Sequence, residues 1–324
     1  MAWLTSDLLA DVRRSGMFPD SAPGGVSDAD ILAQADKELQ SRLLPLVLAV
    51  REEFYVQQTL QPIVGGQQFY RIPGRSIGNK LRDVLLQMSN NTLSSLPRIA
   101  PEQVAELAYQ PGQYPWGYYL ESDSVMLMPS PQSTNGAQLL MKYLLRPGSL
   151  VTHNDNHTPH VVAVSTLNST TTRITHTGSA TFNADAQLPL DIVSIKPPFR
   201  TVMISVTPTA YATGQIDVPT ASLPSDFTTA NFGGGAGFGA IISLAETTPV
   251  VQLPPELFNL LCQRTLCRLL QAVGDLESLQ SAEAQAAAME RGALTLITNR
   301  TEGEPKKVMG RLLQYPRRRL GRFF

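Results

Sequence analysis

The sequence predicts an α+β protein in which helices from both ends form one bundle and β structure is inserted between them. Two features carry this prediction. Near both ends, apolar residues recur at intervals of three and four, the period of a helix with one buried face. In between, apolar residues come in short runs that are separated by Pro, Gly, Asn and Ser, which is typical of short strands and turns.

The N-terminal helical region has two parts. We expect a short helix at 3–14 and, after a loop rich in Pro and Gly, a longer helix at 27–58. Ser27 precedes two acidic residues, so it should cap the second helix. Pro45 lies inside this helix and removes a backbone donor, which predicts a kink.

The centre of the chain is expected to be rich in strands. The turn spacing within 158–218 favours a small sandwich or barrel. A short helix is expected at 101–107, and 219–253, which holds a Gly-rich run, is interpreted as a long irregular connection. The expected strands cover residues 68–72, 80–87, 116–120, 124–128, 137–145, 160–165, 171–176, 190–195 and 201–213.

The helical period returns at Pro254 and indicates a hairpin of two helices, with Gly274 ending the first. The second, roughly 275–299, has an Ala-rich middle that allows close packing, and its apolar residues include Leu276, Met289 and Leu296. The resulting segments are N-terminal helices (1–66), a mixed β segment (67–150), a β-rich insertion (151–253), the C-terminal helical hairpin (254–300) and a basic extended tail (301–324).

The composition favours a protein that has part of its surface covered by a partner. Charged residues make up 16% of the chain, against about 25% in ordinary globular proteins. Cys262 and Cys267 are five residues apart in a helical stretch, so they do not share a helix face and a disulfide is not expected. This suits a reducing cytoplasm. We expect neither a signal peptide nor a membrane span, because no apolar run is long enough.

The last 25 residues carry eight basic and two acidic side chains, within an otherwise acidic chain. This asymmetry suggests that the tail has its own partner. Docking on a protein is favoured, with DNA phosphates as the second possibility and a solvated end as the third. Terminal aromatic residues suit pockets on a protein partner. The candidate contact residues are Lys306, Lys307, Arg311, Tyr315, Arg317, Arg318, Arg319, Arg322, Phe323 and Phe324.

The sharpest candidate metal site is the segment HNDNHTPH, in which His153, His157 and His160 accompany Asp155. Imidazole and carboxylate groups at this density could ligate zinc or nickel. Asn, Asp and Pro are also turn residues, however, and the segment lacks an apolar helical face. A polar turn that leads into a strand is therefore the favoured interpretation.

Other catalytic patterns are weak. The segment GAGFGA at 235–240 fits a dinucleotide-binding variant, but neither a preceding strand nor a long following helix is expected. The remaining carboxylates of interest, Asp123, Asp185, Asp191 and Asp217, lie near expected turns, where solvated acids are the favoured interpretation. We expect no cofactor and no enzymatic activity.

Several segments resemble head-to-tail adaptor proteins of short-tailed and related bacteriophages. The resemblance spans most of 27–310 and is weakest at 150–250. The segments that carry it are SLPRIAPEQ (95–103), YPWGYY (114–119), VMLMPSP (125–131), MKYLLRP (141–147), the helical stretch 254–270, GD (274–275) and NRTEG (299–303).

The resemblance implies a virion protein, made in the host bacterial cytoplasm, that forms a ring of usually twelve copies beneath the portal ring. The bundle would build the ring wall, and the tail would dock on the portal. The β part would face outward, toward tail (nozzle) proteins or fibres. DNA would pass through the channel during ejection without sequence-specific contact.

Two alternatives stay open. A tail-fibre or carbohydrate-binding module could use the β region at 158–218, and a metal-dependent hydrolase could use the three histidines. The first predicts a monomer or trimer with affinity for saccharides. The second predicts a stoichiometric metal.

Overall fold

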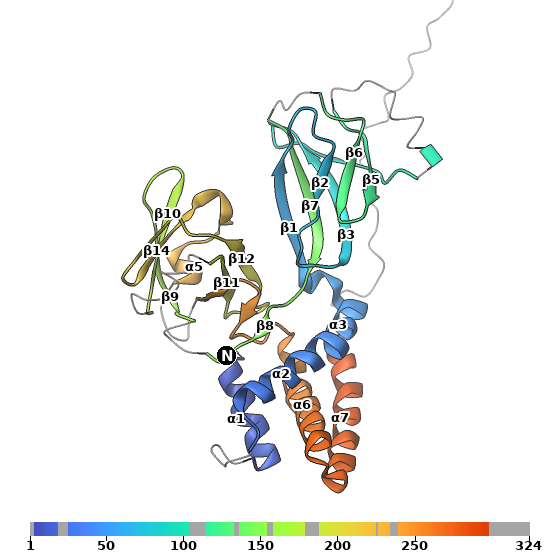
Figure 1. The fold of residues 1–324 in the computed structure, drawn as a ribbon, viewed down its shortest axis with the longest axis vertical. Coiled ribbons are helices and arrows are strands. Elements are labelled where there is room, and N and C mark those ends of the chain that lie inside the picture. The colour runs from blue at the N-terminus through green and yellow to red at the C-terminus, as the bar shows by residue number, and fades with distance from the viewer. Residues whose placement is uncertain are drawn as a thin grey trace, which may run out of the picture.

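The computed structural model describes residues 3–18, 25–100, 102–103, 114–132, 136–153, 158–178, 188–224, 226–233 and 239–297. Helices from both ends of the described chain pack together, and antiparallel sheets are inserted between them (Figure 1). The α+β class and the composite bundle are therefore confirmed. The tail at 301–324 lies outside the described residues, as do most of the expected helix at 101–107 and of the Gly-rich run.

The second N-terminal helix begins as predicted, whereas the first begins at Thr5, two residues later than expected. Ser27 caps α2, because its Oγ accepts a hydrogen bond from the Asp30 N–H at 3.1 Å and its own N–H donates to the Asp30 carboxylate at 3.2 Å. This reciprocal pair satisfies two donors that the helix leaves open. The N-terminal elements are α1 (Thr5–Gly16), α2 (Asp28–Glu38), η1 (Leu39–Leu43), α3 (Leu44–Arg51) and η2 (Glu52–Tyr55).

Pro45 distorts the helix in the turn that precedes it along the chain. The helix adopts a π turn over Leu39–Leu43 before α3 resumes with Pro45 in its first turn. A proline ring clashes with the carbonyl four residues before it and offers no N–H, so a wider turn accommodates it. The predicted kink thus takes the form of a π turn.

The helical segment that begins after Ser27 is shorter than the predicted range of 27–58. It ends by Tyr55, and β1 (Val56–Pro62) follows directly and pairs with β7 along its length. The segment 1–66, predicted to hold helices, therefore also contains a sheet strand. Periodicity missed this strand because its side chains are only partly buried or exposed.

The first β unit (residues 56–145) is a small sandwich. One sheet has the order β1-β7-β3-β4 and the other β2-β6-β5. Tyr70, Leu86, Leu127, Leu139 and Met141 fill the space between them. Besides β1, its strands are β2 (Phe69–Arg71), β3 (Ser76–Gln87), β4 (Leu93–Ser95), β5 (Gly117–Glu121), β6 (Ser124–Met128) and β7 (Gln138–Leu145).

The second β unit (residues 161–244) also has two sheets, ordered β13-β14-β10-β9 and β12-β11-β15. Its core includes Val161, Ile174, Ile192, Ile216 and Ile242. A parallel pair, β8 (Ser149–Leu150) and β16 (Thr247–Thr248), lies between this unit and the helices (Figure 1). The strands of the unit are β9 (Val161–Thr166), β10 (Thr171–His176), β11 (Leu190–Ser194), β12 (Thr201–Val206), β13 (Ala210–Ala212), β14 (Gln215–Pro219) and β15 (Ala240–Leu244).

Two strand predictions in this unit were wrong. The expected strand at 201–213 is two strands, β12 and β13, interrupted around Pro208. The expected irregular connection at 219–253 contains β15, β16 and the short helix α5 (Thr229–Phe232). In β15, residues 240–243 are all buried, so the strand lacks the alternation that identifies a half-exposed strand.

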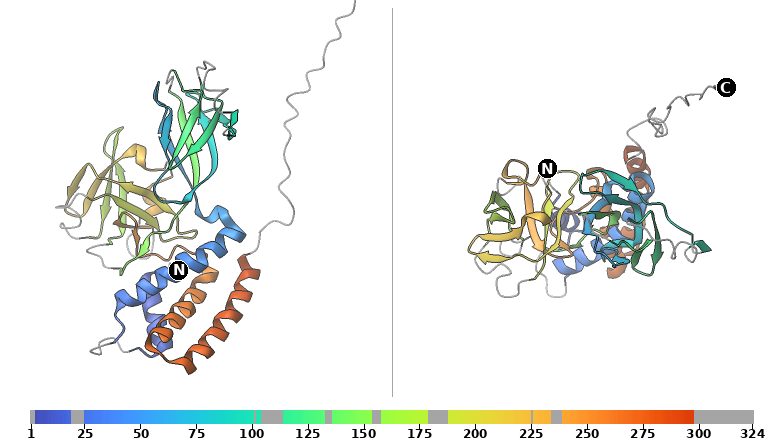
Figure 2. Two further views of the ribbon diagram at one scale, coloured as in Figure 1. Left: turned by 45° about the vertical axis from the view of Figure 1, so that its right-hand side comes forward. Right: turned by 90° about the horizontal axis from the view of Figure 1, so that it is seen from above.

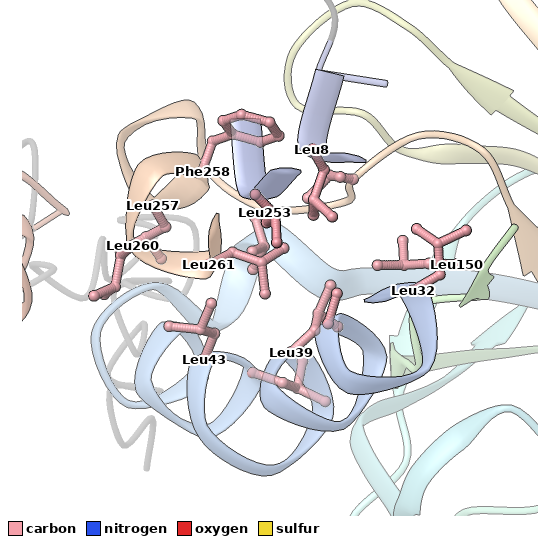
Figure 3. Close-up of a cluster of buried hydrophobic side chains, with 14 of the residues drawn as sticks. Leu8, Leu32, Leu39, Leu43, Leu150, Leu253, Leu257, Phe258, Leu260 and Leu261 are labelled. Atoms are coloured by element: carbon pink, nitrogen blue, oxygen red, sulfur yellow. The ribbon is translucent and has the colours of Figure 1, made fainter. Parts of the chain in front are cut away.

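The C-terminal helices complete the bundle. They are η4 (Pro255–Leu257), α6 (Phe258–Val273) and α7 (Leu276–Ile297), with Gly274 in the left-handed conformation at φ 85° between the last two. Leu261 of α6 lies in the same buried cluster as Leu8 and Leu39 (Figure 3). The α6–α7 hairpin packs beside the N-terminal helices, as Figure 2 also shows.

Only some of the apolar residues of α7 are buried. Ala282, Ala286, Ala293 and Ile297 are buried. The larger side chains Leu276, Met289 and Leu296 are instead 71%, 42% and 69% exposed. Small residues allow α7 to approach α6 closely, and the larger ones then point away from that contact.

Candidate assembly surfaces and the junction that positions them

The predicted docking residues, from Lys306 to Phe324, all lie outside the described residues. The structure does fix where that segment starts. Ile297, the last residue of α7, is fully buried in the same cluster as Val47 of α3 and Leu257. The C-terminal end of α7 therefore lies at the end of the bundle next to the β units, away from the α6–α7 turn (Figure 1).

The opposite end of the bundle, which we call the tip, exposes apolar side chains. Met17 at the end of α1 is 90% exposed, and Val273 and Leu276, on either side of Gly274, are 61% and 71% exposed. Single exposed apolar side chains are common on protein surfaces, so these residues are candidates for contacts made on assembly.

A buried glutamine joins the end of the N-terminal helices, the segment that follows β7 and the second β unit. The side-chain amide of Gln252 donates to the Phe199 carbonyl at 3.0 Å and to the Thr201 hydroxyl at 2.9 Å. Its side-chain oxygen accepts from the Gly148 N–H at 3.2 Å. The Tyr55 hydroxyl, at the end of η2, donates to the Gln252 carbonyl at 2.8 Å. Burial raises the pKa of Tyr55, so it remains a protonated donor.

A buried ion pair joins the two β units directly. Arg75, between β2 and β3, binds Asp191 of β11 and also donates to the Arg146 carbonyl at 3.1 Å. Asp191 accepts further hydrogen bonds from the N–H groups of Ser205 at 2.8 Å and Glu246 at 3.0 Å. Burial raises the pKa of Asp191, while Arg75 and the two N–H donors oppose that change.

The contacts of Gln252 and of the Arg75–Asp191 pair define what we call the junction. Sequence reasoning missed it, and had placed Asp191 near a turn as a solvated acid. One signal was available, because Asp191 stands between Leu190 and Ile192 in an apolar run. A charge in such a run needs a buried partner. The sequence alone does not indicate which arginine supplies it.

The candidate metal residues are only partly described. The rings of His153 and His160 lie 5.0 Å apart, edge to face, and His153 Nδ1 lies 2.9 Å from the Thr158 hydroxyl. His157 and Asp155 lie outside the described residues. Among the residues described, no three His, Cys, Asp or Glu side chains gather as a metal site would require.

The other candidate catalytic residues that the structure describes form ion pairs or are buried thiols. Asp123 pairs with Arg71 at 3.1 Å and Asp217 with Arg173 at 2.8 Å, whereas Asp185 lies outside the described residues. Neither cysteine forms a disulfide. Burial raises the pKa of Cys262 to about 12, so the thiol is protonated and a poor nucleophile at neutral pH.

The buried polar groups of the junction join the helical bundle and the second β unit to the rest of the chain, so their part in this protein is structural. Residues 5–171 match the family model described as SU10 adaptor protein. The match covers just over half of the chain, so the protein belongs to the SU10 adaptor protein family. It is thus a phage adaptor, a structural component of the virion that binds other virion proteins.

Two further findings accompany this assignment. No curated protein matches the sequence. Within the described part of the chain, none of the helices combines the length and apolar character needed to cross a membrane.

Proposed function

We propose that the protein is a subunit of the head-to-tail adaptor ring, which docks on the portal ring through residues 306–324 and joins it to tail proteins. Family membership over residues 5–171 is the observation that carries the proposal. The match ends in β10, so the assignment of the C-terminal helices and tail to this role rests on their own features.

In this proposal the tail is the portal-binding element. Eight basic residues and two terminal phenylalanines combine charge with aromatic anchors. The burial of Ile297 provides a fixed base from which the segment starts. A fully extended chain spans at most about 3.3–3.6 Å per residue, so 27 residues reach on the order of 90 Å.

The other parts then take distinct roles. The bundle forms the wall of a ring of twelve copies. DNA passes through the channel of this ring without sequence-specific contact. Neighbouring copies cover exposed apolar groups such as Leu296 and Met289 of α7. The β segment (67–150) and the insertion (151–253) face tail or fibre proteins. The low charged fraction of 16% suits a subunit with two lateral contacts.

Binding of the full chain to the purified portal ring from the same source tests the docking role. We expect deletion of 305–324 to abolish binding. The double substitution of Phe323 and Phe324 by Ala should weaken it at every salt concentration. The triple substitution of Arg317, Arg318 and Arg319 by Gln should weaken it mainly at low salt, because charge contacts are screened. Unimpaired binding of the deletion variant would overturn the assignment of the tail.

A further inference from the structure

Between the two β units runs a groove of about 690 Å³ that is walled by strand edges. On one side it is lined by four consecutive residues of β1, from Gln57 to Leu60. A strand that faces a groove with one surface contributes alternate residues, because neighbouring side chains point to opposite faces. Consecutive residues therefore show that the edge of β1, with its backbone groups, faces the groove.

The pairing of β1 with β7 shows which backbone groups these are. The Ile63 N–H donates to the Ala137 carbonyl at 3.1 Å, and the same register continues back along both strands. Antiparallel partners exchange hydrogen bonds at every second residue. Gln57 and Thr59 therefore face β7, whereas the N–H and C=O groups of Gln58 and Leu60 face the groove.

The opposite wall is also a sheet edge. β12 is the outer strand of its sheet, and Thr201, Val202, Ile204, Ser205 and Val206 line the groove. The side-chain amide of Gln57 reaches across to the Thr201 carbonyl at 2.8 Å. The Gln57 side chain therefore bridges the two edges at this end of the groove. One added strand needs a gap of roughly 10 Å, which is twice the spacing of paired strands.

The lining selects a weakly charged occupant. Of its three charged lining residues, Arg75 pairs with Asp191 and Arg200 with Asp226, which leaves Glu246 as the one carboxylate that the lining contributes. In the adjoining pocket of about 420 Å³, Lys142 lies 3.9 Å from Asp83. The other lining groups are mostly aliphatic, hydroxyl or amide. This surface offers little to the strongly basic tail of the protein.

We propose that the groove binds an extended, nearly uncharged segment of another protein, which adds as a strand to the free edge of β1. Alternating aliphatic and hydroxyl or amide side chains would match the walls. An unprotected sheet edge readily accepts such a strand. The half-exposed side chain of Leu60 gives it an apolar anchor. This site does not depend on portal docking, and it is assayed without the portal.

The probe is a fluorescent seven-residue peptide, acetyl-Ser-Val-Thr-Val-Gln-Val-Thr-amide, added to the full-length protein. Binding should protect the amides of Gln58 and Leu60 from hydrogen exchange, because those groups gain partners. The amides of Gln57 and Thr59 should change little, because they already bond to β7. A version of the peptide with every amide N-methylated should not bind.

The variant Gln58→Pro removes a donor that faces the groove and should weaken peptide binding at least tenfold. The matched control is Ser95→Pro, on the opposite edge of the same sheet. There the Leu96 N–H donates to the Val84 carbonyl, so Ser95 faces away from β3 by the same alternation. This control should bind like the unmodified protein, with circular dichroism confirming that both variants fold.

Three outcomes would overturn the proposal. The first is no binding of the peptide at millimolar concentration. The second is binding of the peptide without alternating protection of the β1 amides from hydrogen exchange, because the peptide would then lie elsewhere. This outcome can be detected in the unmodified protein. The third is tighter binding of a peptide that spans residues 305–324, which would make the tail the occupant.

Discussion

Arg75 and Asp191 form an ion pair between the two β units in which the side chains are only 8% and 1% exposed. This ion pair and the hydrogen bonds of Gln252 together hold the two β units in one relative orientation. In an adaptor that contacts several virion proteins, this orientation sets the spacing of the surfaces that each partner meets.

Removing one partner of this pair should be costly. Asp191→Ala leaves a buried guanidinium and two N–H donors without an acceptor, and we expect a loss of about 3–5 kcal/mol in the free energy of unfolding. Chemical denaturation measures it. The matched control is Asp123→Ala, because the Arg71–Asp123 pair is 82% and 49% exposed and should lose less than about 1 kcal/mol. Equal losses would show that the buried pair does not hold the units.

Gln252→Ala should destabilise the protein more than Tyr55→Phe. The first change removes three side-chain hydrogen bonds, to Gly148, Phe199 and Thr201. Each buried group left without a partner costs about 1–3 kcal/mol. The second removes one hydroxyl, with an expected loss of about 1 kcal/mol. Denaturation curves of the two variants decide the order, and the reverse order would contradict the role given to the Gln252 side chain.

The bundle core should respond to a cavity, whereas the tip should not. Leu261 is fully buried, so Leu261→Ala is expected to cost about 2–5 kcal/mol. Val273→Ala, at a side chain 61% exposed, should stay within about 0.5 kcal/mol of the unmodified protein. Thermal and urea unfolding provide the comparison. A large loss from Val273→Ala would mean that the tip is packed in the isolated protein.

The cap of α2 should make part of the stability depend on pH. Hydrogen bonds from Ser27 lower the pKa of Asp30 below its usual value of 3.8. A lowered pKa stabilises the folded state above pH 3.8, and that contribution is lost as the pH falls through the folded pKa. Ser27→Ala should therefore destabilise the protein at pH 7 and do so less at pH 2.

NMR titration of the Asp30 carboxyl gives the second readout. In Ser27→Ala its pKa should rise toward 3.8, because the side-chain donor is lost while the backbone N–H stays. An unchanged pKa, or an equal stability difference at both pH values, would contradict the contribution of this cap.

Periodicity predicted the helices because each buries one face. Ile31, Ala35, Leu39 and Val47 repeat at helical spacing and are all buried in the bundle. The same reasoning failed for β15, which is buried along residues 240–243 and shows no alternation. It also failed for β1, whose position is set by its pairing with β7, more than seventy residues away.

The candidate site was predictable to a smaller extent. Charge asymmetry singles out the tail from the sequence alone, but its residues lie outside the described chain. The junction depends on contacts between segments far apart, such as Tyr55 with Gln252 at 197 residues of separation. No local pattern marks Gln252 as different from other glutamines. The groove arises in the same way, because β1 and β12 belong to different sheets.

The native mass of the full-length protein, alone and mixed with the portal ring from the same source, tests the central claim most directly. The adaptor account predicts that twelve copies bind one portal ring and that a protein lacking residues 305–324 binds none. A monomer or trimer that does not bind the portal ring would contradict this account and would favour a fibre or carbohydrate-binding role for the β units.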